Sequence, residues 1–286
     1  MNLCDYDSIR ALLGRHGFHF SKSMGQNFLI DPEIPYRIAA SSQADQSCGV
    51  LEIGPGIGPL TAELAQRANK VVSIELDKSL LPVLAETMEP YPNVEIVPGD
   101  AMQIDFQALV DEKFQGLRPI VCANLPYNIT TPILEKFIMT PCFESVTVLI
   151  QKEVAQRLSA PQGSTDGGSF SLFLQYYMDT EYLFDVPREK FLPAPKVTSA
   201  VLRCVRREKP AVDVEDEEFF FKVMRGGFLL RRKTLANSLS AALKGYDKET
   251  IQTAIEACGL RPDVRGERLT LQDFANLAKT LAASKA

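Results

Sequence analysis

The chain has 286 residues, of which 45% are hydrophobic, so it can bury a full core and divide into two domains. No apolar run approaches the roughly 20 residues of a membrane span, and residues 1–10 lack the apolar core of a signal peptide, which predicts a cytoplasmic protein without membrane contact. The formal net charge of −5 neither supports nor excludes a nucleic-acid partner, because residues 1–200 carry 15 Lys and Arg against 24 Asp and Glu, whereas residues 201–286 carry 16 against 12.

From residue 49 onward, short β-branched runs alternate with amphipathic stretches. We expect strands at residues 49–53, 71–75, 94–97, 120–123 and 146–150. Helices are expected between the first strands, at residues 60–68 and 79–88. This alternation predicts an α/β fold with a parallel, doubly wound sheet.

Polar residues end four of these strands at nearly even spacing. They are Glu52, Glu75, Asp100 and Asn124, separated by 23, 25 and 24 residues. One βα unit has about this length, so all four side chains should reach the same edge of the sheet. Ligands in open α/β sheets bind at that edge.

The pattern changes after residue 160. A flexible loop is expected at residues 162–168, and an acidic run at 213–218 opens a helical tail. Its helices should cover residues 215–226, 231–243, 247–257 and 270–283. We therefore predict two domains, residues 1–206 and a smaller all-helical domain at 207–286.

The six cysteines are scattered without a CxxC pair, which argues against a disulfide framework or a metal site. His16 and His19 have no evident ligand partners nearby in the sequence. We predict buried thiols, no metal and, by default, a monomer.

A glycine-rich turn, EIGPGIG at residues 52–58, lies where the first strand becomes a helix. A dinucleotide fingerprint would be G-x-G-x-x-G, but Pro59 occupies its third glycine position, and no Gly-Lys-Ser/Thr of a phosphate loop is present. The turn instead resembles that of class I (Rossmann-like) S-adenosylmethionine methyltransferases. In such a site Glu75 can accept hydrogen bonds from the ribose hydroxyls and Asp100 from the adenine amine; the alternative is that both merely end strands in water.

The run NLPY at residues 124–127 resembles the [Asn/Asp/Ser]-Pro-Pro-[Tyr/Phe] motif of amino-methylating enzymes. The exocyclic nitrogen of adenine shares its lone pair with the ring, so acceptors on its two hydrogens are needed to make it a nucleophile. The Asn124 side-chain oxygen and the Pro126 carbonyl are the candidates. Tyr127 offers a ring for stacking an extruded base. No strong base is required, because attack on a sulfonium yields an acidic ammonium.

Further motifs are similar to those of the ribosomal RNA adenine dimethyltransferases. They are FSKSMGQNFL (20–29), QKEVA (151–155), FLPAPKV (191–197), RRKTL (231–235) and RLTLQDF (268–274). The tail resembles the branch that dimethylates two adjacent adenosines near the 3′ end of 16S rRNA in the small (30S) subunit, late in its assembly. Two alternatives stay open: a 23S rRNA methyltransferase of the antibiotic-resistance type, and an assembly factor whose catalysis is secondary.

The resemblance implies a methyltransferase domain followed by a helical RNA- or ribosome-binding domain. It also implies that Phe191 forms the second wall of the base pocket. S-adenosylmethionine, which leaves as S-adenosylhomocysteine, would be held by Gln26, Asn27, Leu29, Glu52, Gly54, Gly56, Glu75, Leu76, Asp100, Ala101 and Asn124. One departure is the apolar run FLL at 228–230, where the family pattern is more polar.

Basic residues are the expected phosphate contacts, which would position RNA without reading its sequence. The candidates are Lys22, Lys152, Arg157, Lys190, Lys196, Arg225, Arg231, Arg232 and Lys233. The alternative for each is a solvated surface charge.

Overall fold

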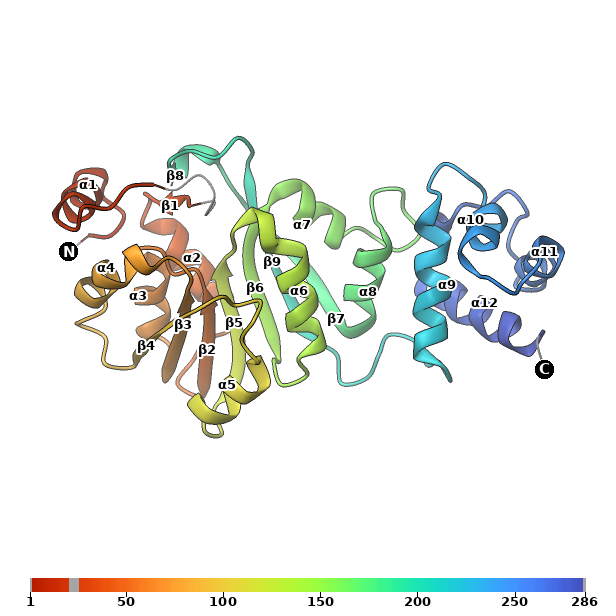
Figure 1. Cartoon of the computed structure of the whole chain (residues 1–286), viewed down its shortest axis with the longest axis horizontal. Coiled ribbons are helices and arrows are strands. Elements are labelled where there is room, and N and C mark those ends of the chain that lie inside the picture. The colour runs from red at the N-terminus through yellow and green to blue at the C-terminus, as the bar shows by residue number, and fades with distance from the viewer. Residues whose placement is uncertain (1, 21–25, 285–286) are drawn as a thin grey trace. The chain divides into compact units, whose positions relative to one another are not determined.

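The computed structural model describes residues 2–20 and 26–284, which form two compact units (Figure 1). One unit comprises Met1–Ala155 and Thr180–Arg206, and the other Gln156–Asp179 and Arg207–Ala286. The chain passes into the second unit at Gln156, returns to the first at Thr180 and passes into the second again at Arg207. Residues 156–179 therefore belong to the second unit, whereas the sequence-based division at 206/207 places them in the first. Within the described ranges, no helix is long and apolar enough to cross a membrane.

The elements up to Gln151 alternate as the sequence predicts. Their bounds are α1 (Tyr6–Arg15), β1 (Phe28–Leu29), α2 (Glu33–Ser41), β2 (Cys48–Ile53), α3 (Pro59–Ala65), β3 (Lys70–Glu75), η2 (Lys78–Leu80), α4 (Leu81–Thr87), β4 (Val94–Pro98), α5 (Phe106–Lys113), β5 (Arg118–Asn124), η3 (Tyr127–Ile129), α6 (Thr130–Met139) and β6 (Ser145–Gln151). The five expected strands are thus β2 to β6.

The remaining elements follow β6. They are α7 (Lys152–Leu158), α8 (Ser169–Tyr177), β7 (Met178–Val186), η4 (Arg188–Lys190), β8 (Phe191–Leu192), β9 (Ser199–Arg206), α9 (Glu217–Leu229), α10 (Leu235–Ala242), α11 (Lys248–Ala257), η5 (Gly266–Arg268) and α12 (Leu271–Ala283). The four tail helices lie close to their expected ranges, except that α10 begins four residues later than expected.

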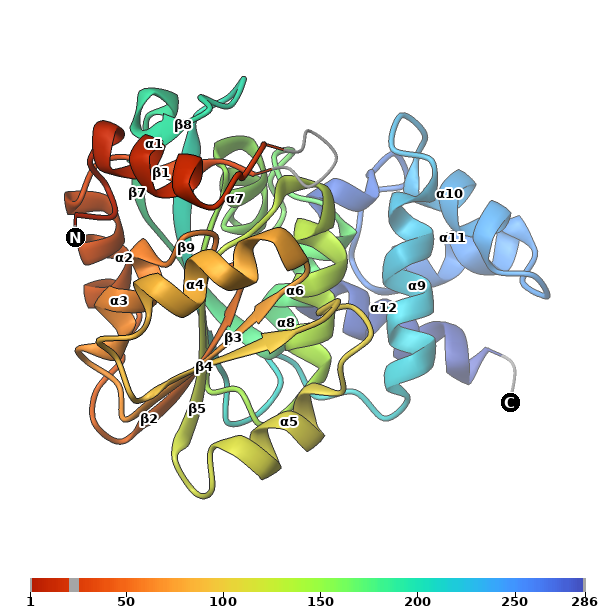
Figure 2. The ribbon, with the colours of Figure 1, turned by 60° about the vertical axis from the view of Figure 1, so that its left-hand side comes forward.

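Among the described residues, seven strands form one sheet in the order β4-β3-β2-β5-β6-β9-β7 (Figure 2). The strands β2 to β6 pair in parallel. The expectation of a parallel sheet fails at β9, which runs antiparallel to β6 with Ser199 opposite Gln151. An antiparallel edge on an otherwise parallel sheet is common in such folds.

The chain runs from β2 outward to β3 and β4 and then returns to β5 on the other side of β2. Successive residues of β2 face opposite sides of the sheet: Val50 packs in a core cluster with residues of α2 and α3, whereas a Cβ at Gly49 would lie 2.4 Å from the Phe114 ring, just beyond α5. Helices therefore cover both faces, and a crevice opens where the strand order reverses.

The second unit has a core of its own, and α8 belongs to it. Leu172 and Tyr176 of α8 are buried in one cluster with Phe220, Leu239 and Phe274 of the tail helices. This shared core is why residues 156–179 group with the tail, and an apolar face on α8 cannot indicate by itself which core it will join.

The basic triplet at residues 231–233 lies in a turn rather than in the expected helix 231–243. The helix α10 begins only after Thr234, whose side chain accepts a hydrogen bond from the Asn237 backbone N–H. A threonine in this position is a strong helix start. All three basic side chains are exposed.

Gly266 gives a test of the packing in the second unit. A Cβ there would lie 2.2 Å from the backbone oxygen of Gly227, so one of the two segments would have to move. We expect Gly266→Ala to lower the free energy of unfolding by about 2 kcal/mol, measured by urea unfolding followed by circular dichroism.

The matched control is Gly14→Ala in α1, where a Cβ meets no atom within 4 Å. It should raise the free energy of unfolding by about 0.5–1 kcal/mol, because alanine favours the helix. Equal effects of the two substitutions would contradict the tight packing at Gly266.

Candidate active site

A cleft of about 1000 Å³, including space open to solvent, lies at the carboxyl ends of β2, β3, β4 and β5. The sequence-predicted residues that line it are Gln26, Asn27, Leu29, Glu52, Gly54, Gly56, Glu75, Leu76, Asp100, Ala101, Asn124, Pro126 and Tyr127. The regular spacing of the four polar strand ends therefore does bring them to one place.

The glycine-rich turn forms the floor of the cleft beyond β2. Gly54, Gly56 and Gly58 have φ values of 67°, 61° and 95°, a conformation that other residues rarely adopt. A Cβ at Gly56 would also lie 3.1 Å from the Phe28 ring. Glycine is thus required here both for the turn and for the close approach of the backbone to the cleft.

Glu52 is a buried acid beside this turn, with only 1% of its surface exposed. Its Oε2 accepts hydrogen bonds from Thr61 Oγ1 at 2.7 Å and from Ser73 Oγ at 2.6 Å. Burial raises the pKa of Glu52 to about 7, against the effect of these two donors. Sequence patterns gave no hint of Thr61 and Ser73, which come from α3 and β3.

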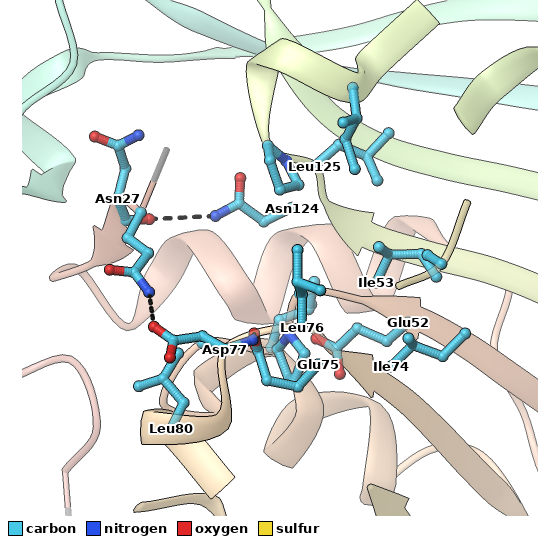
Figure 3. Close-up of a pocket in the computed structure, with 18 of the residues that line it drawn as sticks. Asn27, Glu52, Ile53, Ile74, Glu75, Leu76, Asp77, Leu80, Asn124 and Leu125 are labelled. Carbon is cyan, nitrogen blue, oxygen red and sulfur yellow. Dashed lines mark hydrogen bonds between the residues drawn. The ribbon is translucent and has the colours of Figure 1, made fainter. Parts of the chain in front are cut away.

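Glu75 ends β3 and is also buried. Its Oε1 accepts from the Asp77 backbone N–H at 2.7 Å. Burial raises its pKa to about 6, although the N–H group of Asp77 favours the charged form. A carboxylate has about four acceptor positions, so Glu75 can accept further hydrogen bonds from a ligand. Figure 3 shows Glu52, Glu75, Leu76 and Asp77 gathered on one wall of the cleft.

The turn after β4 contributes Asp100 and Ala101. Asp100 is exposed, and its Oδ1 accepts from the Met102 backbone N–H at 2.9 Å. Leu76 also lines the cleft, and 53% of its surface is exposed. It therefore offers an apolar surface against which a flat ring can pack. A carboxylate and an exposed leucine that line the same cleft suit a nucleobase that carries an amine.

The N-terminal segment crosses the cleft and is bound to both of its walls. Gln26 Nε2 donates to Asp77 Oδ2 at 2.6 Å, and Asn124 Nδ2 donates to the Asn27 backbone oxygen at 3.4 Å (Figure 3). Asp77 was missed by sequence reasoning, although an Asp two residues beyond a strand end and before Ser79, whose N–H it caps, is a recognisable signal.

In the NLPY motif, the Pro126 carbonyl is not the free acceptor that the sequence predicts. The Pro126 carbonyl accepts from the Ile129 backbone N–H and from Thr130 Oγ1, both at 3.2 Å, so its two lone pairs serve the start of α6. Pro126 lines the cleft, but its oxygen is engaged. Within the described residues, the Leu125 carbonyl has no hydrogen-bond donor, which makes it the better candidate.

Tyr127 is held by a residue that sequence reasoning did not single out. Its hydroxyl lies 2.6 Å from the Oγ of Ser199, a fully buried residue of β9. Burial raises the pKa of Tyr127 above its usual value.

Phe191, expected as the second wall of a base pocket, does not line this cleft. Its side chain is 3% exposed and packs in the core around Leu29 and Val201.

The expected phosphate contacts divide between the two units. In the first, Lys152 pairs with Asp185 and Lys190 with Asp31, whereas Lys196 is exposed. In the second, Arg231 approaches Glu267 at 3.8 Å. Arg157, Arg225, Arg232 and Lys233 are exposed and form no ion pair with another described residue. Lys22 lies outside the described residues.

The family described as ribosomal RNA adenine dimethylase matches residues 17–283 of the chain. This chain belongs to the ribosomal RNA adenine dimethylase family. It is 46% identical to "Ribosomal RNA small subunit methyltransferase A" of Anoxybacillus flavithermus, over 95% of this chain and 94% of that protein. It is 45% identical to the protein of the same name from Streptococcus equi, over 98% of each.

Solved structures agree with the fold of this ribosomal RNA adenine dimethylase. The 23S rRNA methyltransferase ErmE is 26% identical, with a TM-score of 0.69 over 90% of this chain and 100% of that chain. A dimethyladenosine transferase from Plasmodium falciparum is 25% identical, with a TM-score of 0.72 over 87% of this chain and 95% of that chain. The expected Rossmann-like methyltransferase fold with a helical C-terminal region is confirmed.

A methyltransferase family implies S-adenosylmethionine as the methyl donor, and the cleft of this dimethylase suits that ligand. The sulfonium and ammonium of the donor are cationic, and the cleft is lined by the carboxyl groups of Glu52, Glu75 and Asp100. Left-handed Gly54 and Gly56 let backbone approach the ligand without a side chain in between. The residues that line the cleft are therefore chemically suited to S-adenosylmethionine.

The buried acid of this dimethylase makes its stability depend on pH. Because the pKa of Glu52 rises from 4.5 to about 7 on folding, the folded protein binds a proton that the unfolded chain releases over this range. We expect wild type to lose up to about 3 kcal/mol relative to Glu52→Gln as the pH rises from 4.5 to 7. Urea unfolding of both proteins across that range measures the difference; a difference that stays constant would contradict the raised pKa.

Proposed function

We propose that the protein uses S-adenosylmethionine to dimethylate the N6 atoms of two adjacent adenosines in a hairpin near the 3′ end of 16S rRNA in the small (30S) subunit, as part of subunit biogenesis. The observation that carries this proposal is a single cleft in which an acidic wall faces the Asn124 amide of the NLPY motif. The names and full-length coverage of the relatives support the small subunit as the substrate.

The proposed cofactor contacts follow from the lining of the cleft. Glu75 accepts from the ribose hydroxyls, since it has acceptor positions beyond the one used by Asp77. Asp100 accepts from the adenine amine through the oxygen that does not bind Met102. Leu76 and Ile53 contact the faces of the ligand's rings, and Gln26, Asn27 and Leu29 close the cleft from the N-terminal segment.

Asn124 is the proposed catalytic residue. Its Nδ2 is occupied by the Asn27 carbonyl, which leaves Oδ1 as the acceptor for the target amine. The Leu125 carbonyl takes the second hydrogen of that amine, in place of the Pro126 carbonyl. Together they would draw the target nitrogen toward a tetrahedral shape and free its lone pair. S-adenosylmethionine, when bound, would supply the methyl group, whose bond to sulfur breaks as its bond to this nitrogen forms.

Tyr127 is the proposed stacking surface for the extruded adenine. Its hydroxyl bond to Ser199 fixes the ring in one orientation. Phe191 can form the opposite side of such a pocket only if its buried ring becomes accessible when RNA binds. The methylated nitrogen then loses its proton to water, so the site needs no strong base.

The exposed basic residues are the proposed phosphate contacts. In the second unit Arg225, Arg232 and Lys233 are exposed cations without acidic partners among the described residues. Lys196 has the same character in the first unit. Phosphate contacts of this kind position RNA and make its binding salt-dependent.

The test is transfer of labelled methyl groups from S-adenosylmethionine to unmethylated small and large ribosomal subunits, with the labelled nucleoside identified. We expect N6,N6-dimethyladenosine in small subunits alone. Label confined to large subunits would assign the protein to the type represented by the 23S rRNA methyltransferase ErmE. Donor binding without transfer to either subunit would favour an assembly factor whose catalysis is secondary.

Asn124→Ala tests the assigned chemistry. Loss of one acceptor on the amine should lower kcat about 10²- to 10³-fold, whereas loss of the 3.4 Å contact to Asn27 should weaken S-adenosylhomocysteine binding by much less. Single-turnover methyl transfer and calorimetric binding measure the two effects.

The matched control is Asn128→Ala, an exposed asparagine four residues further on that does not line the cleft. It should transfer methyl groups at the wild-type rate. Equal rates for Asn124→Ala and wild type would remove Asn124 from the mechanism.

A further inference from the structure

The side chain of Lys136, in α6, is partly buried, and its ammonium group has an unusual set of partners. Its Nζ donates to the backbone oxygens of Ala101 and Met102, both at 2.9 Å, and of Ile104 at 2.6 Å. The same Nζ lies 4.4 Å from the centre of the Phe106 ring. A lysine has three N–H donors, so all three are used on one short stretch of backbone.

That stretch is the turn between β4 and α5, which passes beside α6 (Figures 1 and 2). Its first residues, Asp100 and Ala101, line the cleft, whereas Lys136 does not. Lys136 therefore contacts the turn from outside the cofactor site and cannot touch the ligand itself.

One peptide group connects the ammonium to the Asp100 carboxylate. Lys136 binds the oxygen of the peptide between Ala101 and Met102, and Asp100 Oδ1 accepts from the N–H of that same peptide at 2.9 Å. A trans peptide is planar with its oxygen and hydrogen on opposite sides, so holding one end fixes the direction of the other. A chain of hydrogen bonds of this kind also polarises its members.

We propose that Lys136 is a positioning residue that holds Asp100 in place for the adenine amine of the methyl donor. This inference rests on the donor named under the proposed function, but not on the RNA substrate. Because α6 begins at Thr130, three residues after the NLPY motif ends, the same helix also connects the adenine end of the cleft to the catalytic end.

The other charges around Lys136 are consistent with this role. Asp100 and Asp105 raise the pKa of Lys136, whereas burial lowers it more strongly. No acidic side chain forms an ion pair with Lys136 among the described residues, so its hydrogen bonds serve the backbone of the turn. A residue placed only for general stability would not have to converge on the turn that carries Asp100.

The experiment compares two ligands by titration calorimetry on the full chain, without RNA. One is S-adenosylhomocysteine, and the other is S-inosylhomocysteine, in which a carbonyl replaces the adenine amine. We expect wild type to bind the adenosine compound at least about tenfold more tightly, because an unpaired acceptor disfavours the inosine compound. Lys136→Met should bind S-adenosylhomocysteine about tenfold more weakly and lose most of that preference, since Asp100 is no longer preorganised.

The control is Lys113→Met, another lysine of the first unit, which pairs with Glu95 and Glu112 and does not line the cleft. It should keep both affinities. Lys136→Arg, which retains a cation with several donors, should recover part of the preference and serves as the test variant if Lys136→Met does not fold.

A Lys136 variant that folds and keeps the wild-type preference for the adenine amine would overturn the proposal, even if it binds both ligands more weakly. This test is independent of the proposed RNA substrate, because absence of methyl transfer to ribosomal subunits would leave the affinities for these two ligands unchanged. Failure of wild type to bind S-adenosylhomocysteine would instead refute the cofactor and this inference together.

Discussion

The site depends on the reversal of strand order between β2 and β5. Because β2 is paired in parallel with both β3 and β5, the connections that follow these strands leave the sheet at one edge but in opposite directions. The space between them is where the glycine-rich turn and the NLPY motif face each other. A Cβ added at Gly54 would lie 3.8 Å from the Pro126 ring, which is van der Waals contact, so the two segments lie close together here.

Contacts across the cleft add a second constraint. The Asn124 side chain donates to the Asn27 backbone, and the Gln26 side chain donates to the Asp77 carboxylate, so residues far apart in the chain hold each other in place. The most informative consequence is at Asn124: occupying its Nδ2 leaves its oxygen for the reaction. A pocket with the same residues but without the N-terminal segment would not decide which end of that amide faces the target.

The sequence was sufficient for the strands of the parallel sheet and for the edge at which their polar residues meet. Regular spacing predicts this because each βα unit returns the chain to the same edge. It could not predict β9, whose antiparallel pairing with β6 joins residues 48 (Gln151 and Ser199) to 60 (Ser145 and Val205) positions apart, nor the placement of α8 in the second core. Apolar periodicity predicts which face of a helix or strand is buried, but not which other element packs against that face.

The same limit applies to individual residues of the site. Glu75, Asp100 and Asn124 follow from their positions at strand ends, whereas Thr61, Ser199 and Lys136 act through partners from other elements. The motif alone predicts the Pro126 carbonyl as an acceptor, but the way α6 begins engages that oxygen with Thr130. Resemblance predicts Phe191 in the base pocket, but the core packed around its ring buries it.

The most direct measurement is a crystal structure of this chain with S-adenosylhomocysteine bound. The account predicts ribose hydroxyls on Glu75, the adenine amine on Asp100, and the sulfur facing Asn124 Oδ1 with the Asn27 contact retained. A ligand seated outside these residues, or an Asn124 amide turned so that its nitrogen faces the sulfur, would contradict the claim that one cleft brings methyl donor and target amine together.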